Sequence, residues 1–338
     1  MTNTVEERLF RAPYLQPHPG SDKPLIVVFS LLSRADNTPL TERHRADGHI
    51  LDHNGKSLID PAADAVKNVF EGNPNINFEH WGEYWRKVHG VRFTYAENSD
   101  DHSLEHLQRY DQLHRFAPGP THTDAPPYRA PVDAQSNLWP TVIGHIETYQ
   151  RPRWDGVAYL NFTGLEDIPV ALGNARVREK SLPEDQAIFR DIAPMLSRQY
   201  IFTPSNKGNE PITLVKLHVR KATVSRSSFQ KWWLNEHGNI AATQSKTWVR
   251  RYVQLHNIGP TEEGQPLYHP QASGIDGVTL MSFDNLGDLE DFLLSPEYKK
   301  IVGYESLMMD IAAGEWWTTI DIVLINRISP ELATDLST

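Results

Sequence analysis

The chain of 338 residues contains no cysteine, which excludes disulfides, thiolate nucleophiles and cysteine-type zinc sites. Its net charge of −10 offers no excess of basic residues for a nucleic acid or an anionic membrane. No run approaches the ~20 apolar residues of a transmembrane helix, and the first residues lack the apolar core of a signal peptide. We therefore expect a cytoplasmic protein with no nucleic-acid or membrane partner.

Three common signatures of catalysis are also missing from the sequence. There is no phosphate-binding glycine loop, no dinucleotide-binding fingerprint and no Gly-x-Ser-x-Gly nucleophile elbow. The chain is instead rich in tryptophan (9) and histidine (15), so its chemistry is more readily sought among histidines and aromatic walls. Its length is sufficient for two domains, each with its own core.

One pattern occurs twice along the chain. An aromatic pair, three further residues and His-Gly stand at 84–90 and again at 232–238. Each copy is followed by Asp-Gly-Val, a phenylalanine and Asp-Ile-Ala at closely similar spacings. These positions begin at Asp155, Phe162 and Asp191 in the first copy and at Asp276, Phe283 and Asp310 in the second. The repetition indicates that one ancestral unit was duplicated.

The second copy predicts the element order β-α-β-β-α-β of a ferredoxin-like unit. We expect strands at 211–220, 250–256, 277–283 and 318–325, a helix ending at Gly238, and a helix at 286–309 broken at Ser295-Pro296.

The first copy predicts the same order with two long interruptions. We expect strands at 25–32, 142–149, 157–162 and 198–203, a helix at 79–88, and helical segments at 165–175 and within 183–196. The first domain then covers 1–204, with insertions at about 34–77 and 91–140 that form a lid or rim. A polar linker at 205–210 leads to the second domain at 211–330.

Each expected unit leaves one face of its sheet uncovered, and that face must pack on something. The fold class we predict is therefore α+β: two ferredoxin-like units in one chain, with their sheets packed face to face as a pseudo-dimeric α/β barrel.

The residues of the second copy resemble a known family. Phe229-x3-Trp233-x3-His237-Gly238, Arg251-Tyr252, Asp276-Gly277-Val278, Phe283 and Ser295-Pro296-Glu297-Tyr298 are similar to EthD-type proteins of the dimeric α/β-barrel superfamily. The resemblance covers roughly 212–326, and a weaker, interrupted version covers 25–203. It implies sheets that face each other around a cavity, with both units supplied here by one chain. It also implies hydrophobic, often aromatic, ligands.

His89 and His237 occupy equivalent places in the two copies, and we take both as candidate catalytic residues. Imidazole titrates near neutral pH, so it can accept and return a proton during a reaction. The alternative is structural, because a histidine before a helix-ending glycine can bond the last carbonyl groups of the helix. The resemblance favours a catalytic role, since the equivalent histidine of relatives lies beside the cavity.

The candidate substrate-binding residues lie on strands and beside the two histidines. Lys216, His218 and Arg220 share one side of the strand at 211–220, and a barrel cavity would turn them inward, toward a substrate carboxylate or oxyanion. A solvated strand face is the alternative. Tyr252 would join them from the next strand. Trp85 and Trp233 either wall the pocket or pack in the core.

A second histidine pattern suggests a metal site, which we do not favour. His102-Ser103-Leu104-Glu105-His106 matches the H-x-x-E-H pattern of zinc peptidases if it lies on a helix, but no third ligand is evident. A solvated helix in the lid is the alternative. We interpret His44, His49 and His53 as loop residues.

These observations together favour a cofactor-independent enzyme of lyase, dehydratase, decarboxylase or isomerase type. It would act by histidine acid/base chemistry on a hydrophobic, oxygenated and possibly aromatic small molecule of a degradation or biosynthesis pathway. Two alternatives stay open: a non-catalytic carrier of hydrophobic ligands, and a haem-binding enzyme, since relatives hold haem in this barrel. No metal or other cofactor is expected otherwise, and a homodimer is an open possibility.

Overall fold

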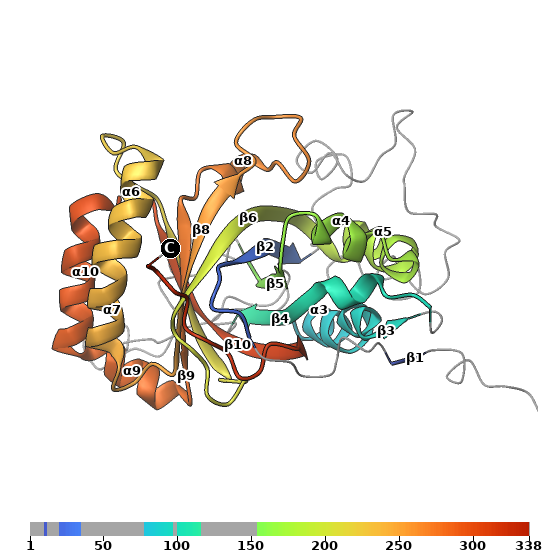
Figure 1. Cartoon of the computed structure of the whole chain (residues 1–338), viewed down its shortest axis with the longest axis horizontal. Helices are drawn as coiled ribbons and strands as arrows, with labels where there is room; N and C mark the ends of the chain where they lie inside the picture. Colours follow the sequence, from blue (N-terminus) through green and yellow to red (C-terminus); the bar gives the residue numbers. More distant parts are fainter. Residues whose placement is uncertain (1–9, 12–19, 35–77, 97–99, 116–153, 338) are drawn as a thin grey trace, which may run out of the picture.

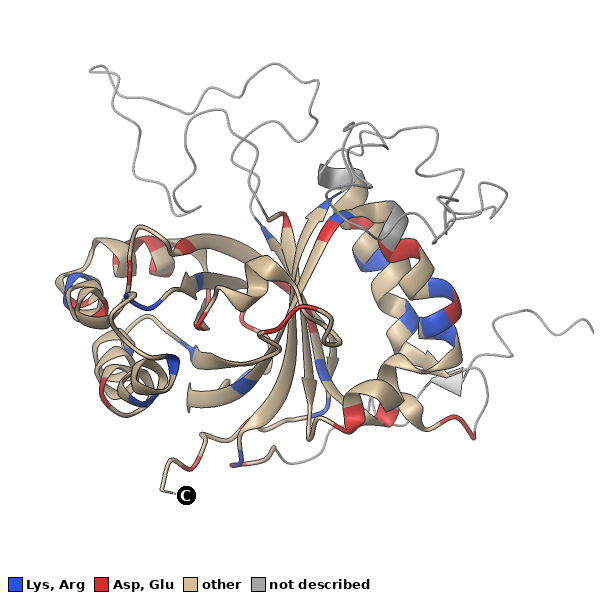
Figure 2. Cartoon of the chain, turned by 90° about the horizontal axis from the view of Figure 1, so that it is seen from above, with Lys and Arg blue, Asp and Glu red and all other residues tan. Residues whose placement is uncertain are grey.

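The structure is a computed structural model that describes residues 10–11, 20–34, 78–96, 100–115 and 154–337. Within these residues the long strands close into a barrel, in the order β10-β4-β5-β2-β6-β8-β9-β7, and every neighbouring pair is antiparallel. Helices cover the barrel on two opposite sides, as Figures 1 and 2 show. The chain is therefore an α+β protein built on a closed barrel.

The two halves of the chain contain the same order of elements. The first half consists of β2 (Leu25–Arg34), α3 (Phe78–Tyr84), β4 (Leu107–Arg115), β5 (Gly156–Phe162), α4 (Asp167–Leu172), α5 (Leu182–Ile188) and β6 (Phe189–Thr203). The second half consists of β7 (Ile212–His218), α6 (Arg226–Trp232), α7 (Gly238–Ser245), β8 (Arg251–Gly259), β9 (Gly277–Phe283), α9 (Leu286–Leu294), α10 (Pro296–Met308) and β10 (Glu315–Asn326). Short elements are β1 (Phe10–Arg11), β3 (Tyr95–Ala96) and α8 (Pro270–Ser273).

The two four-stranded sheets join at both edges. The last strand of the first half, β6, pairs with β8, and the last strand of the second half, β10, pairs with β4. The sheets thus face each other across the interior, and hydrogen bonds at both seams close them into one barrel. Closure leaves no exposed edge in the barrel sheet that the described strands form, which removes a common route to aggregation.

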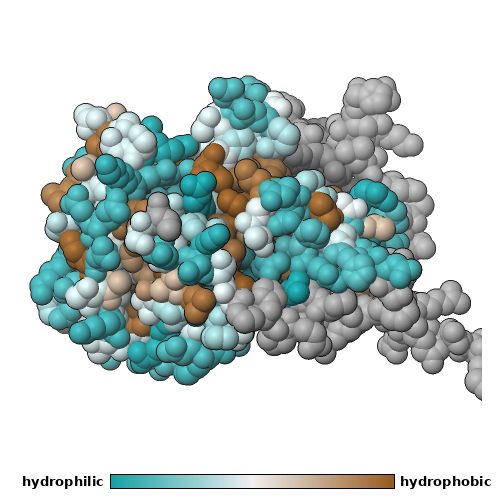
Figure 3. All heavy atoms as spheres, in the orientation of Figure 1, coloured by the Kyte–Doolittle hydropathy of each residue, from teal (hydrophilic) through white to brown (hydrophobic). Residues whose placement is uncertain are grey.

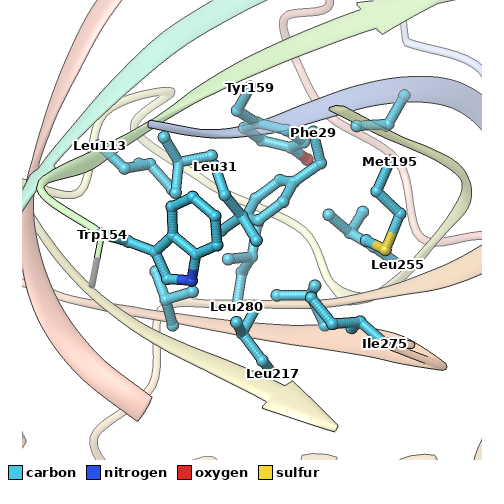
Figure 4. Close-up of a cluster of buried hydrophobic side chains, with 14 of the residues drawn as sticks. Phe29, Leu31, Leu113, Trp154, Tyr159, Met195, Leu217, Leu255, Ile275 and Leu280 are labelled. Atoms are coloured by element: carbon cyan, nitrogen blue, oxygen red, sulfur yellow. The ribbon is translucent and has the colours of Figure 1, made fainter. Parts of the chain in front are cut away.

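The barrel interior is largely filled with apolar side chains. Alternate residues of each strand point inward; Val27, Phe29 and Leu31 on β2 belong to this set. They meet Trp154, Met195, Leu217, Leu255 and Leu280 from around the barrel, as Figure 4 shows. The resemblance implied a cavity between the two sheets. Where the described residues form this apolar cluster, the barrel is packed by its own side chains, as is usual for a small barrel.

The outer face of each sheet packs under its own helices. In the second half, Ile212, Leu214 and Phe283 contact the apolar side of α7, α9 and α10. Hydrophobic residues also reach the surface between the two helical layers, over the barrel strands (Figure 3). Among the described residues, no helix is both long and apolar enough to cross a membrane.

Most expected elements of the second half are confirmed, including the break between α9 and α10 at Ser295-Pro296. The expected helix end at Gly238 is wrong. A π-helical turn, Trp233–His237, joins α6 directly to α7, and Gly238 has ordinary helical backbone angles. Its missing side chain matters for packing, because a Cβ there would lie 2.1 Å from the ring of Phe202.

The expected strand at 142–149 lies outside the described residues, and its place in the sheet is taken by β4 at 107–115. That strand falls inside the segment we expected to be an insertion at 91–140. We expected that segment to form a lid or rim, yet Arg109, Asp111 and Arg115 of this strand are buried. The last strand of this half also starts earlier than expected, at Phe189.

Candidate active site

A pocket opens between the outer face of β7 and helix α10. The empty space inside the pocket and at its mouth, open solvent included, is about 440 Å³. The lining residues are Lys216, Leu217, His218 and Val219; Tyr298, Val302, Glu305 and Met309; and Asp310, Ile311, Gly314, Glu315 and Trp316. Its ionisable residues are Lys216 and His218 on the strand, Tyr298 and Glu305 on one side of α10, and Asp310 and Glu315 after that helix.

A buried ion pair forms one wall of this pocket. Lys216 Nζ donates to both oxygens of Glu305, at 2.6 and 2.7 Å, and the two side chains are 7% and 4% exposed. Lys216 also lies over the Tyr298 ring, 5.2 Å from its centroid. Burial lowers the pKa of Lys216, but attraction to Glu305 and Tyr298 outweighs it and raises the pKa above its ordinary value. The lysine therefore stays charged at neutral pH.

His237 belongs to the π-helical turn, lies next to Glu305 and is not among the residues that line the pocket. Its Nε2 is 3.8 Å from Glu305 Oε1, and the side chain is 1% exposed. The ring packs against Trp232 at 5.5 Å between centroids, and neither ring nitrogen has a hydrogen-bond partner among the described residues. Burial, and then repulsion from Lys216, lower the pKa of His237 to about 3. The imidazole is therefore neutral and available to accept a proton.

Lys216 and His218 do not point into the barrel as expected. Strand alternation places Val215 and Leu217 inside, so their neighbours face the helices. His218 lines the pocket, with its Nε2 2.9 Å from Thr279 Oγ1. Burial and then the charge of Lys216 lower its pKa well below the ordinary value.

The other expected binding residues of this half make structural contacts around the pocket. Arg220 bonds through its side chain and backbone N–H to the carboxylate of Asp276. The hydroxyl of Tyr252 accepts from Gln254 Nε2 at 2.7 Å, and the same amide donates to the carbonyl of Trp233 at 3.1 Å. Tyr252 and Trp233 are fully buried and do not line the pocket.

Comparisons with known proteins bear on this half of the chain. Residues 221–312 match the family model described as the EthD domain. The resemblance to EthD-type proteins is thereby confirmed. The EthD match spans α6, α7, α9 and α10, and so includes His237 and Glu305. A search of curated proteins gave no match.

Several solved structures share distant similarity with the whole chain. An anthrone oxidase-like protein has 12% sequence identity and a TM-score of 0.46, covering 97% of this chain and 100% of its own. A proposed monooxygenase from Lactobacillus acidophilus NCFM has 9% identity and a TM-score of 0.41, covering 93% and 100%. A mutant chlorite dismutase from Candidatus Nitrospira defluvii has 10% identity and a TM-score of 0.33, covering 87% and 91%.

In the first half, the counterpart of the EthD histidine is His89, which lies 3.6 Å from Glu184 Oε2 and 3.4 Å from Asp185 Oδ1. The cation that pairs with Glu184 is Arg92, from the 3-10 turn after His89, whereas the second half uses a lysine of its first strand. Burial, together with repulsion from Glu184, raises the pKa of Asp185 to about 6, although His89 opposes the shift. Trp85, like Trp233, is a core residue whose carbonyl accepts from a glutamine, Gln112.

The H-x-x-E-H segment does not form the expected α-helix. Ser103–His106 is a 3-10 turn that leads into β4. His102 pairs with Glu105, whereas His106 Nδ1 lies 2.6 Å from Asp167 Oδ1, so the two imidazoles have separate partners. Within the described ranges, no three histidine or acidic side chains gather as metal ligands. His44, His49 and His53 lie outside those ranges.

Glu305 was not among the site residues predicted from the sequence, although Glu305 contacts two of them, Lys216 and His237. A usable signal was present. Tyr298, Val302 and Glu305 follow at i, i+4 and i+7 after the Ser295-Pro296 helix start, so they share one face of α10.

Proposed function

We propose that the pocket on α10 is the active site of a small-molecule enzyme that works by proton transfer without a cofactor. The proposal rests on the buried Lys216–Glu305 ion pair, which forms one wall of the pocket. The neutral His237 lies 3.8 Å from Glu305, outside the lining. Buried ion pairs contribute little net stability and are found at functional sites, where charge is held ready for a reaction.

The geometry assigns a role to each of the three groups. Lys216 would bind the oxygen of the substrate on which negative charge develops, as an oxyanion donor does. Glu305, which lines the pocket, would take the proton from the substrate and pass it to His237, whose Nε2 lies 3.8 Å from Glu305 Oε1 and which is outside the lining. Burial is the main cause of the lowered pKa of His237 and repulsion from Lys216 is the second, so a substrate oxyanion at Lys216 would offset only the smaller of the two. Elimination and isomerisation, as in lyases, dehydratases and isomerases, use such a proton abstraction. A decarboxylase would use the same oxyanion site and return a proton to the carbanion.

The substrate class follows from the walls of the pocket. Val302, Met309 and Ile311 are apolar, and Trp316 adds an aromatic surface. Such walls favour a hydrophobic molecule, aromatic ones included, while the single cation favours one acidic oxygen on it. His218 would contact the ligand from the strand side without providing its Nε2, which faces Thr279.

Descent of both halves from one duplicated unit is part of this proposal. Arg109-Tyr110-Asp111-Gln112-Leu113-His114 and Arg251-Tyr252-Val253-Gln254-Leu255-His256 are nearly identical. The shared side chains also make the same bonds: each glutamine donates to the preceding tyrosine hydroxyl and to a tryptophan carbonyl.

Haem ligation, an alternative raised by the resemblance, does not fit the residues of this pocket. The one histidine in its lining, His218, has its Nε2 engaged with Thr279. His237 keeps both ring nitrogens unpartnered within the described structure, but it lies behind Glu305 and outside the lining. We therefore derive no step through a haem group.

The proposal is tested with a panel of hydroxylated aromatic and polyketide-like compounds. Binding is followed by tryptophan fluorescence, because Trp316 lines the pocket, and turnover by mass spectrometry of the products. We expect at least one compound to be converted, and we expect Lys216→Met to weaken its binding about tenfold or more. Lys207→Met, at an exposed lysine, is the matched control.

The other outcomes separate the alternatives. Tight binding without conversion would identify a non-catalytic carrier and contradict the enzymatic role. Binding that survives Lys216→Met unchanged would place the ligand elsewhere in the molecule.

A further inference from the structure

Two buried arginines, one from each half, meet where the C-terminal segment after β10 reaches the barrel. Arg109 on β4 and Arg251 on β8 begin the two copies of the Arg-Tyr-x-Gln-x-His sequence. Their side chains are 1% and 2% exposed, and that of Glu331, which lies between them, is 3% exposed. Because a buried cation needs a partner, the three groups must be considered together.

Glu331 is bound as a ligand would be. Its carboxylate accepts from Arg251 Nε at 2.9 and 3.0 Å, from Arg251 Nη2 at 2.8 Å, and from the backbone N–H of Ser205 at 2.8 Å. The same Arg251 Nη2 donates to the hydroxyl of Tyr159 at 3.2 Å. The forked contact from guanidinium to carboxylate is the strongest common form of ion pair.

Arg109 is only partly satisfied by this arrangement. Its Nε donates to Asp111 Oδ2 at 2.6 Å, but Nη1 stays 3.7 Å from Glu331 Oε1 and has no hydrogen bond within the described part of the chain. Asn161, the cross-strand partner of Arg109 on β5, likewise has a side chain without hydrogen bonds to described residues. Native proteins leave few buried polar groups unpaired, so these groups indicate a site built to bind polar atoms.

Glu331 is the carboxylate of the cluster whose pKa is lowered, because its burial is outweighed by attraction to Arg251 and Arg109. Burial raises the pKa of Asp111, and burial together with repulsion from Asp111 raises that of Asp321 well above its ordinary value. Glu331 is therefore the main counter-charge of the two arginines. Its removal would leave them facing two carboxyl groups whose charged forms burial disfavours.

We propose that Arg109 and Arg251 form a carboxylate-binding site at the junction of the two halves, and that the chain's own Glu331 occupies it. The bound tail then makes three further contacts with the first half. Thr334 Oγ1 accepts from the N–H of Ile201 at 2.8 Å, Pro330 O accepts from Gly20 at 3.1 Å, and Asp335 donates its N–H to Asp22 O at 2.8 Å. The site thus fixes the tail across the junction.

The test is chemical rescue of the full-length Glu331→Ala variant by a small carboxylate. The truncation empties the site, so we expect the unfolding temperature to fall by roughly 10 °C. Sodium formate or acetate should restore most of this loss with a saturable dependence on concentration. Wild type and Asp335→Ala, an exposed acidic residue of the same tail, receive the same titration and should shift little.

A second variant isolates the charge from the shape. Glu331→Gln keeps the size of the side chain, so it should be destabilised yet insensitive to formate, because the amide still fills the site. An unchanged unfolding temperature in Glu331→Gln overturns the proposal, even if Glu331→Ala does not fold. A destabilised Glu331→Ala that formate restores no better than chloride overturns it as well, since that result would reflect lost packing alone.

Discussion

The two halves share the same order of strands and helices but differ in the side chains that surround the equivalent histidine. Asp155 and Asp276 occupy equivalent turns. Each donates its backbone N–H to a carbonyl group on the first strand of its half: Asp155 to Leu32 on β2, and Asp276 to His218 on β7. This equivalence places Ser30 of the first half where the second half has Lys216. The cation that pairs with the glutamate beside the histidine is therefore the strand lysine Lys216 in the second half and Arg92 in the first half, where Asp185 adds a second carboxylate beside His89.

The difference separates the side chains that the two halves share from those in which they differ. The tyrosine, glutamine and histidine on the second strand of each half make the same hydrogen bonds, so they hold the first helix on the sheet. The residues at the helix face and on the first strand vary, and these set the charge of the site. Chemistry can thus be changed in one half while the fold of both is kept.

The largest effect we expect comes from breaking the Lys216–Glu305 pair. Glu305→Gln would leave a buried ammonium without its counter-charge, which costs about 3–5 kcal/mol of the free energy of unfolding. Glu184→Gln in the first half should cost less, because its partner Arg92 is more exposed. Urea denaturation of both variants makes the comparison.

A loss in Glu305→Gln no larger than in Glu184→Gln would remove the contrast between the halves. Lys207→Met, which breaks an exposed pair with Asp284, is the control and should change stability by less than about 1 kcal/mol.

The second prediction compares the two histidines in turnover of whichever substrate the compound panel identifies. His237→Ala should lower turnover by ~10²-fold or more while the protein stays folded, because it removes the proposed proton acceptor. His89→Ala should have a smaller effect, since the first strand of that half carries Ser30 in place of Lys216 and so offers no charge there to hold an oxyanion. His102→Ala, at a surface histidine paired with Glu105, is the control.

Equal turnover in folded His237→Ala and wild type would exclude His237 from the mechanism. A larger loss in His89→Ala would instead identify the first half as the active one.

Much of the fold was predictable because the repeat and strand alternation are local signals. The strands at 25–34, 156–162, 212–218 and 277–283 and the helix break at Ser295-Pro296 follow from periodicity and from proline. The strand at 107–115 was missed because charged residues normally indicate solvent, whereas Arg109 and Asp111 are buried as a pair. Residues 109–114 of this strand agree with residues 251–256 at five of six positions, so a comparison of the two segments would have identified the strand.

The candidate site was predictable only in part, because alternation shows which residues share a face but not which face is inside. Lys216 and His218 share one face of β7, as expected, yet that face meets α10 rather than the barrel interior. The partner of Lys216 comes from 89 residues further along the chain. Only the packing of α10 on the sheet brings Glu305 to it, and no spacing rule predicts such a contact.

The smallest predicted effect uses pH to separate the halves. The pKa of Asp185 is raised to about 6, so between about pH 4 and 6 the folded protein binds more protons than the unfolded chain. This contribution to stability is present at low pH and is lost as pH rises through that range. His237 acts with the opposite sign: its pKa is lowered to about 3, so stability is present above about pH 6.5 and is lost as pH falls.

Asp185→Asn should therefore gain stability relative to wild type as pH rises from 4 to 7, whereas His237→Gln should gain as pH falls over the same range. The measurement is the unfolding temperature of each variant minus that of wild type, taken across pH 4–7. The Asp185 effect should be modest, because that side chain is 21% exposed and solvent screens its charge. Difference curves with the same slope would mean that the two sites do not carry the opposite ionisations on which the contrast between the halves depends.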